Sequence, residues 1–160
     1  MDSHRIADPQ AVRARALALL GRRDYARGEL AAALQRKGFD PQAISEVLSE
    51  LAGEGLLDDS RYAEGLVRQL ATRGKGPARV RQALQQAGVE AEGSATALSS
   101  GPDWLALASE ARRRKFGAEL PRSWPERARQ MRFLQYRGFS ADQIAAALGG
   151  AQGTEPDSEA

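Results

Sequence analysis

Clustered arginines are the residues of this sequence whose chemistry is easiest to identify. The chain carries 23 basic side chains, 20 Arg and 3 Lys, and its net charge of +2 conceals an uneven distribution. Residues 61–82 hold six basic side chains and one acidic one, and residues 112–137 hold nine and two, which gives net charges of +5 and +7. Residues 24–60 have the opposite balance, three basic against eight acidic, a net charge of −5. Because a guanidinium presents a planar fork of donors that matches phosphate or carboxylate, the two basic stretches predict a positive strip for a polyanion.

A short connection in the first basic stretch carries the most suggestive signal. Arg73-Gly74-Lys75-Gly76 precedes Pro77, a residue typical of the first turn of a helix. The glycines allow a close approach to the backbone, and the free N–H groups at the start of a helix favour an anion. The segment is equally well interpreted as a plain interhelical loop, and any single arginine as a solvated surface charge.

Our candidate binding residues are the basic side chains of the two stretches together with the two glycines of the connection. They are Arg73, Gly74, Lys75, Gly76, Arg79, Arg81, Arg112, Arg113, Arg114, Lys115, Arg129, Arg132 and Arg137.

Most enzyme chemistry lacks the residues to build it. The chain has no Cys and one His, His4, in a polar N-terminal stretch where a surface role is the simpler interpretation. The carboxylates fall at expected helix starts or on polar faces, and no phosphate-binding glycine loop occurs. We therefore expect no enzymatic activity, no cofactor and no metal. The lack of Cys, of a signal peptide and of a long apolar run favours the cytoplasm.

The sequence repeats itself at a shift of 50 residues. Leu34, Gln35 and Gly38 align without a gap with Leu84, Gln85 and Gly88, and again with Leu134, Gln135 and Gly138. Leu48, Leu98 and Leu148 then coincide. Such a period is typical of helical repeat units. We interpret each glycine as the left-handed residue that ends one helix before the next begins.

The next helix of each copy begins at a capping signal. Asp40 precedes Pro41, and Ser140 stands three residues before Gln143 as a capping box. Its apolar residues recur at helical spacing. They are Ile44, Val47, Leu48 and Leu51 in the first copy and Ile144, Ala147 and Leu148 in the third, whereas the middle copy is weaker because of Gly93 and Ser94.

A further amphipathic helix precedes each pair, which gives three sets of three. The first is expected from about Pro9 to Arg23; the second follows Asp58 and Asp59, and the third follows Pro102-Asp103. Their expected buried faces are Val12, Ala16, Leu19 and Leu20; Tyr62, Leu66 and Leu70; and Trp104, Leu107, Ala108 and Ala111. We place repeat 1 at residues 9–57, repeat 2 at 58–99 and repeat 3 at 100–148, between a disordered N-terminus (1–8) and a disordered acidic tail (149–160).

Four segments of the chain resemble the RecX family. They are residues 16–20 (ALALL, with Arg22-Arg23 before Glu29-Leu30), 55–63 (GLLDDSRYA), 74–77 (GKGP) and 137–140 (RGFS). The resemblance covers about residues 11–148, and the pattern Asp-Asp-x-Arg-[Phe/Tyr]-Ala followed by Gly-x-Gly-Pro is its most specific part. The departures are Tyr62 in place of the commoner Phe, and the atypical last helix of the second repeat.

The resemblance implies both a fold and a function. It implies an all-α protein of three tandem three-helix, helix-turn-helix-like repeats in an elongated curved array. It also implies a regulator that binds RecA and its nucleoprotein filament, contacts DNA weakly if at all, and inhibits the ATPase, strand-exchange and co-protease activities of RecA. Recombination, DNA repair and the SOS response would be modulated in this way. We interpret the signature residues as mainly structural: Asp58, Asp59, Arg61, Tyr62, Gly138 and Phe139.

Two other functions fit the residues. A helix pair joined by a glycine-containing turn is also typical of a helix-turn-helix transcriptional regulator, which would show sequence preference and usually a two-fold dimer. A helical adaptor that only happens to be basic is the third possibility. For the regulator of RecA we expect a monomer.

Overall fold

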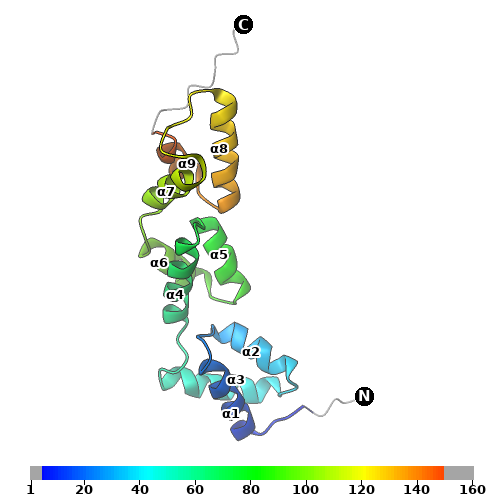
Figure 1. Ribbon diagram of the computed structural model, residues 1–160. Helices are drawn as coiled ribbons and strands as arrows, with labels where there is room; N and C mark the ends of the chain where they lie inside the picture. Colours follow the sequence, from blue (N-terminus) through cyan, green and yellow to red (C-terminus); the bar gives the residue numbers. More distant parts are fainter. Residues whose placement is uncertain (1–4, 150–160) are drawn as a thin grey trace. The chain divides into compact units, whose positions relative to one another are not determined.

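The computed structural model describes residues 5–149, which fold into helices joined by short connections and contain no β-strand (Figure 1). The all-α prediction is confirmed. The helices are α1 (Pro9–Leu20), α2 (Arg27–Arg36), α3 (Pro41–Gly53), α4 (Asp59–Thr72), α5 (Pro77–Gln86), α6 (Ala91–Ser99), α7 (Trp104–Phe116), α8 (Trp124–Arg137) and α9 (Ala141–Ala147). His4 and most of the two termini that we expected to be disordered lie outside the described residues.

The chain divides into two compact units. Unit 1 comprises residues 1–65 and 84–97, and unit 2 comprises residues 66–83 and 98–160. The boundaries cut through α4, α5 and α6, so the helices of the second repeat contribute to both units.

Unit 1 contains an apolar core between α1, α2 and α3. The predicted apolar face of α3 is buried throughout, and Val12 and Ala16 of α1 are fully buried, as expected, while Leu19 and Leu20 are half-buried. Leu30 and Leu34 of α2 complete the centre of the cluster. At about 1.5–3 kcal/mol for each fully buried large apolar side chain, this cluster supplies the main stabilisation of the three helices.

The glycines predicted to end the second helix of each repeat all adopt the left-handed conformation. The φ angles are +94° at Gly38, +84° at Gly88 and +99° at Gly138. The following helices are capped as predicted in the first and third copies. Asp40 Oδ2 accepts from the Ala43 N–H (3.1 Å), and Ser140 forms a complete capping box with Gln143. The period of 50 residues therefore corresponds to a repeated turn.

Each of these glycine turns contacts a segment that lies earlier in the chain within the same unit. The Ile6 N–H donates to the carbonyl of Gly38 (2.9 Å), and Ile6 pairs with Phe39 as an isolated parallel bridge. Ile6 belongs to the segment that we expected to be disordered, and at this residue the structure is ordered instead. A Cβ added to Gly28 would lie 3.2 Å from Gly88 Cα. The second glycine turn therefore also lies close to an earlier backbone segment, the start of α2.

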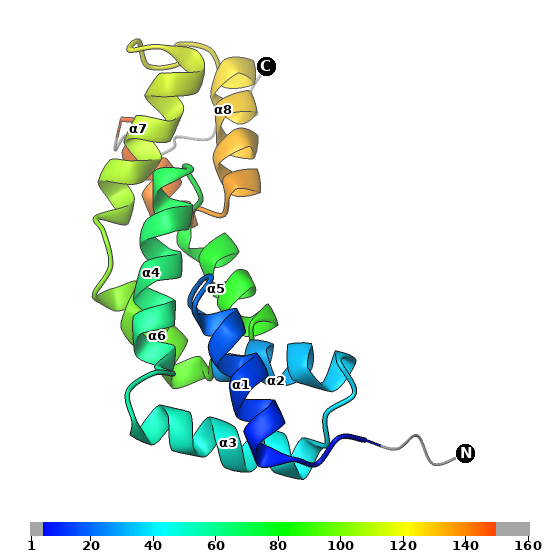
Figure 2. The ribbon, with the colours of Figure 1, turned by 60° about the horizontal axis from the view of Figure 1, so that its bottom comes forward.

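In unit 2, helices α7, α8 and α9 enclose a smaller core. Figure 2 shows α7 and α8 side by side. Its buried residues are Ala108, Leu134, Phe139, Ile144, Ala147 and Leu148. Half-buried Trp104, Leu107 and Ala111 pack against it, as their spacing predicted. Two polar side chains, Arg112 and Gln130, are also buried in this part of the chain.

The buried face of α4 differs by one residue from the predicted one. Ala63, Val67 and Ala71 are buried, whereas the expected residues Tyr62, Leu66 and Leu70 are half-buried. Small Ala side chains occupy the inward positions, and the larger side chains flank them. A periodicity count favours the larger apolar residues and for this reason misplaced the face by about 100°.

The third glycine turn leaves almost no room for a side chain at either of its two facing glycines. A Cβ added to Gly76 would lie 2.5 Å from the carbonyl carbon of Gly138, and a Cβ added to Gly138 would lie 2.5 Å from Arg79 Cγ. Neither position has room for a side chain, so both residues have to be glycine. Gly138 also adopts a positive φ, which favours glycine.

We predict that Gly76→Ala lowers the free energy of unfolding by about 1–3 kcal/mol because the backbones must separate to accept the methyl group. Gly53→Ala is the matched control, since nothing lies within 4 Å of its added Cβ. It should leave the stability unchanged or raise it by up to about 1 kcal/mol. Urea unfolding followed by circular dichroism measures both variants, and equal stabilities would contradict the prediction.

Candidate polyanion-binding surface

The α4–α5 connection lies against the C-terminal end of α8 in unit 2. The Gly76 N–H donates to the carbonyl of Arg137 (2.8 Å), and the Ala78 N–H donates to the carbonyl of Gly138 (3.0 Å). Arg137 in turn donates from Nη1 to the carbonyl of Arg73 (3.2 Å). Candidate residues about 60 positions apart in sequence are thus brought together by backbone hydrogen bonds.

Arginines of this region stack on aromatic rings. The guanidinium carbon of Arg79 lies 4.6 Å from the ring centroid of Tyr136, and Arg79 Nε donates to the Tyr136 carbonyl (2.8 Å). The guanidinium of Arg137 lies 5.1 Å from the ring of Phe133. Such contacts orient a guanidinium while leaving its charge unneutralised.

The same face of α8 continues the positive charge along the helix. Arg129, Arg132 and Tyr136 stand three and four residues apart, so they share one face, and all three are exposed. Residues 73–86 and 127–137 contain no Asp or Glu. We call this region the α5–α8 basic surface and define it as Arg73, Lys75, Arg79, Arg129, Arg132, Tyr136 and Arg137.

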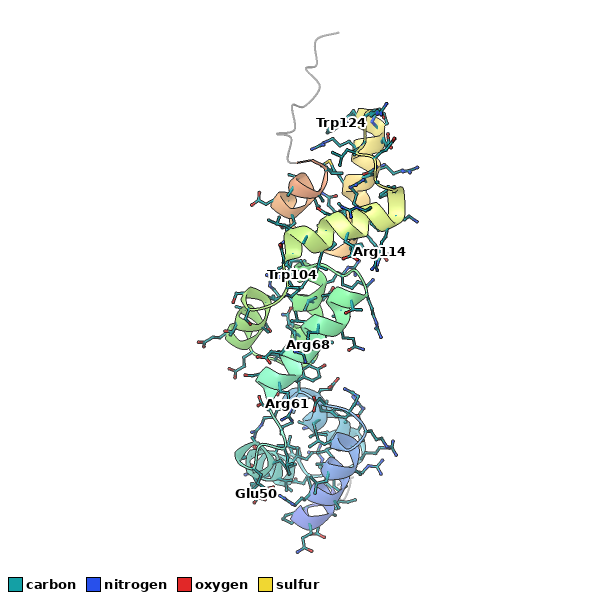
Figure 3. The ribbon with its side chains drawn as sticks, turned by 60° about the vertical axis from the view of Figure 1, so that its left-hand side comes forward. Glu50, Arg61, Arg68, Trp104, Arg114 and Trp124 are labelled. Carbon is teal, nitrogen blue, oxygen red and sulfur yellow. The ribbon has the colours of Figure 1, made fainter. Side chains whose placement is uncertain are left out.

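A second basic group projects from the end of α7. Arg113, Arg114 and Lys115 are exposed, and Arg114 is labelled in Figure 3. Arg114 pairs with Glu110 one turn earlier (2.6 Å). Arg81 is exposed on α5 but stands two positions after Arg79, so it faces another side of that helix.

Arg112 does not belong to any binding surface. It is only 4% exposed and donates to the carbonyls of Glu119 (3.1 Å) and Ala118 (3.4 Å). The side chain thereby fixes the connection between α7 and α8. Our assignment of Arg112 as a binding residue is corrected on this ground: one residue of a four-residue basic run on a helix has to face inward.

Several arginines of unit 1 pair with carboxylates. Arg13 bonds to Glu54 (2.6 Å) and Arg23 to Glu29 (3.0 Å). The hydrogen bond from Arg13 holds the pKa of the Glu54 carboxyl below its usual value. Unit 1 therefore neutralises much of its positive charge internally.

The signature residues in unit 1 have structural partners. Asp58 Oδ1 caps α4 by accepting from the N–H groups of Ser60 (2.9 Å) and Arg61 (3.1 Å). Asp59 Oδ1 accepts instead from the Arg27 N–H (2.7 Å) and so caps α2. Arg61 pairs with Asp24 (3.6 Å). This acidic-basic signature joins the first repeat to the start of α4.

The remaining signature side chains pack rather than bind. Tyr62 is half-buried, and burial together with the nearby charge of Glu29 raises the pKa of its hydroxyl. Phe139 is buried in the core of unit 2 directly after the left-handed Gly138.

Sequence reasoning missed Tyr136 as a surface residue. Its signal lies in the repeat alignment: the equivalent positions hold Arg36 and Gln86, which are polar and exposed. Because the other copies have polar, exposed residues at this position, an aromatic residue there is expected on the surface and not in the core.

Within residues 5–149, no group of His, Asp or Glu is arranged to hold a metal ion. Nor is any helix of that range both long and apolar enough to cross a membrane.

The structure defines a class of protein built from tandem three-helix repeats, with arginines gathered on one surface of its second and third repeats. Family models for the first, second and third three-helix domains of RecX match residues 13–51, 58–98 and 102–148. The chain therefore belongs to the RecX family of regulatory proteins.

Relatives and solved structures agree with this assignment. The chain is 48% identical to the regulatory protein RecX of Halorhodospira halophila over 147 residues, covering 91% of each chain. It is 43% identical to that of Pseudomonas syringae pv. tomato over 148 residues, covering 92% of this chain and 96% of the relative. The crystal structure of RecX from Lactobacillus salivarius has the same fold, with a TM-score of 0.76 at 22% identity over 88% of this chain and 94% of the other.

The buried position of Arg112 can be tested against its neighbour. We predict that Arg112→Ala lowers the free energy of unfolding by about 2–3 kcal/mol, because it opens a cavity and leaves two carbonyls without a donor. Arg113→Ala removes the same charge from an exposed position and should change stability by less than about 0.5 kcal/mol. Thermal unfolding distinguishes the two, and a stable Arg112→Ala protein would refute the assigned role.

Proposed function

We propose that this protein binds RecA and its nucleoprotein filament in the cytoplasm as a monomer and inhibits the ATPase, strand-exchange and co-protease activities of RecA. It would thereby modulate recombination, DNA repair and the SOS response. Membership of the RecX family carries the proposal, since its curated relatives are named as regulatory proteins.

The α5–α8 basic surface supports this function electrostatically. A filament of protein on DNA is a polyanion, and exposed arginines attract it over distances of about 10 Å at ordinary ionic strength. The exposed run at the end of α7, Arg113 to Lys115, adds positive charge from the same unit. Both groups would act without base-specific contacts.

Unit 1 would supply contacts to protein. Residues 24–60 are acidic, and exposed Leu17 and Leu56 add apolar area beside polar helical faces. Such a mixed surface resembles the composition of ordinary protein interfaces.

The charge of the helices that follow the glycine turns argues against a role as a helix-turn-helix transcriptional regulator. In a helix-turn-helix protein the second helix enters the major groove and needs cationic or amide side chains for phosphates and bases. Here α3, α6 and α9 contain no Lys or Arg and carry acidic residues, among them Glu46, Glu92 and Asp142. Two amide side chains are engaged within their own helices: Gln42 donates to Glu46, and Gln143 accepts from the Ser140 N–H. A negative helix would be repelled from the groove.

The proposed inhibition predicts a slower ATPase. Substoichiometric addition of this protein to RecA on single-stranded DNA should lower the steady-state rate of ATP hydrolysis. An unchanged rate at a stoichiometric amount would refute the proposal. Nanomolar preference for one duplex operator at physiological salt would instead establish the transcriptional regulator.

Removing charge from the basic surface should weaken filament binding. We predict that Arg73→Ala with Arg132→Ala lowers affinity for RecA filaments at least about fivefold and makes the dependence of log Kd on log salt shallower by roughly 1.5, because two phosphate contacts are lost.

Arg15→Ala with Arg36→Ala is the matched control for that double variant. It removes the same charge from two exposed arginines on α1 and α2 in unit 1. Its affinity should stay within a factor of about two, because neither arginine belongs to the α5–α8 basic surface. If net charge alone determined binding, both double variants would be weakened equally. Co-sedimentation with filaments at several salt concentrations measures both, and equal losses would show that the location of the charge is irrelevant.

A further inference from the structure

Tyr136 is the most exposed large apolar residue among those described, at 71%. The fold does not account for an aromatic ring at this position. Arg36 and Gln86 occupy the equivalent positions of α2 and α5, and both are exposed. A tyrosine that remains in solvent gains little from packing and leaves apolar area in contact with water.

The ring of Tyr136 is contacted by one guanidinium. The guanidinium of Arg79 lies over it at 4.6 Å from the centroid. That guanidinium is fixed because Arg79 Nε donates to the Tyr136 carbonyl, and because the α4–α5 connection is bonded to the turn that follows α8. One face of the ring is thus covered by a planar cation, and the high exposure of the side chain leaves the rest of the ring accessible.

The surroundings of the ring select for a polyanion. Arg132 and Arg129 stand one and two turns earlier on the same face of α8, and Arg73 lies beside the following turn, where its carbonyl accepts from Arg137. Residues 73–86 and 127–137 hold no carboxylate that could repel phosphates. An aromatic platform with a basic track along the same helix is the arrangement that proteins use to bind single strands, with bases stacked on rings and phosphates on cations.

We propose that Tyr136, backed by Arg79, is a stacking platform for a base of single-stranded nucleic acid. The inference deepens the proposed function, on which it rests for its biological setting, by naming the single strand as a ligand of the α5–α8 basic surface. In a duplex the faces of the bases are already stacked on their neighbours. The platform therefore favours single strands, whereas the arginines alone attract both forms.

The test uses the full chain without RecA. The probe is a fluorescein-labelled oligothymidylate of about 15 nucleotides, within the ~4–16 nucleotides that one single-strand-binding module covers. Fluorescence anisotropy at low salt gives Kd for this strand and for a duplex of the same length.

We expect Tyr136→Ala to weaken single-strand binding about tenfold, the factor that corresponds to ~1.4 kcal/mol, and to leave duplex binding unchanged. Tyr136→Phe keeps the ring and should bind within a factor of about two of the unaltered protein, since stacking needs no hydroxyl. Leu105→Ala removes another exposed apolar side chain of unit 2 and should have no effect.

Crosslinking adds a readout that a purely structural role would not change. An oligonucleotide that carries 5-iodouracil, irradiated in the complex, should crosslink to the tryptic peptide of residues 133–137. The crosslink should persist in Tyr136→Phe and disappear in Tyr136→Ala. Circular dichroism melting verifies that Tyr136→Ala folds, as expected for a side chain this exposed.

Three results would overturn the platform. They are unchanged single-strand affinity in Tyr136→Ala, an equal loss for strand and duplex, and loss of RecA-filament binding without loss on the free oligonucleotide. The last would identify Tyr136 as part of a protein interface. Failure of the proposed function has a different signature, because RecA hydrolysis would then be unaffected while the oligonucleotide still bound through Tyr136.

Discussion

The contact between the backbones of Gly76 and Gly138 is the constraint on which the basic surface depends. With no side chain on either residue, the α4–α5 connection comes close enough for its N–H groups to bond to the carbonyls of Arg137 and Gly138. Those bonds bring Arg73 and Arg79 to the end of α8, where Arg137 and Tyr136 stand. Larger residues would separate the two segments and scatter their charges, so Gly76, which we assigned to ligand approach, acts first on the protein itself.

Arginine side chains are held in two ways in this protein. In unit 1, Arg13 and Arg23 face carboxylates, which neutralise them. In unit 2, Arg79 and Arg137 lie over aromatic rings and donate to carbonyls, which position a guanidinium but leave its positive charge available to a ligand. Pairing with carboxylates compensates positive charge within unit 1, whereas the arginines over aromatic rings in unit 2 can still attract an anion.

What the sequence could predict was local or periodic. The left-handed Gly38, Gly88 and Gly138 and the caps at Asp40 and Ser140 follow from short-range chemistry, and the repeat of 50 residues identified the turns. Three features could not be obtained in this way, because each depends on contacts far along the chain or on which side of a helix faces inward. Arg112 is buried within a run that looks uniformly exposed, Asp59 caps α2 rather than its own helix, and Tyr136 meets Arg79 from 57 positions away.

The pairing of Ile6 with the first glycine turn bears on how such an array can grow. In the third turn the Gly138 carbonyl accepts from Ala78, which belongs to the preceding repeat; in the first turn the Gly38 carbonyl accepts from Ile6. A short extended segment thus occupies the position that an additional upstream repeat would use. Duplication of a further unit in front of the first would have to displace it. The carbonyl of the glycine turn therefore accepts from two kinds of segment, an extended one in the first repeat and the start of a helix in the third.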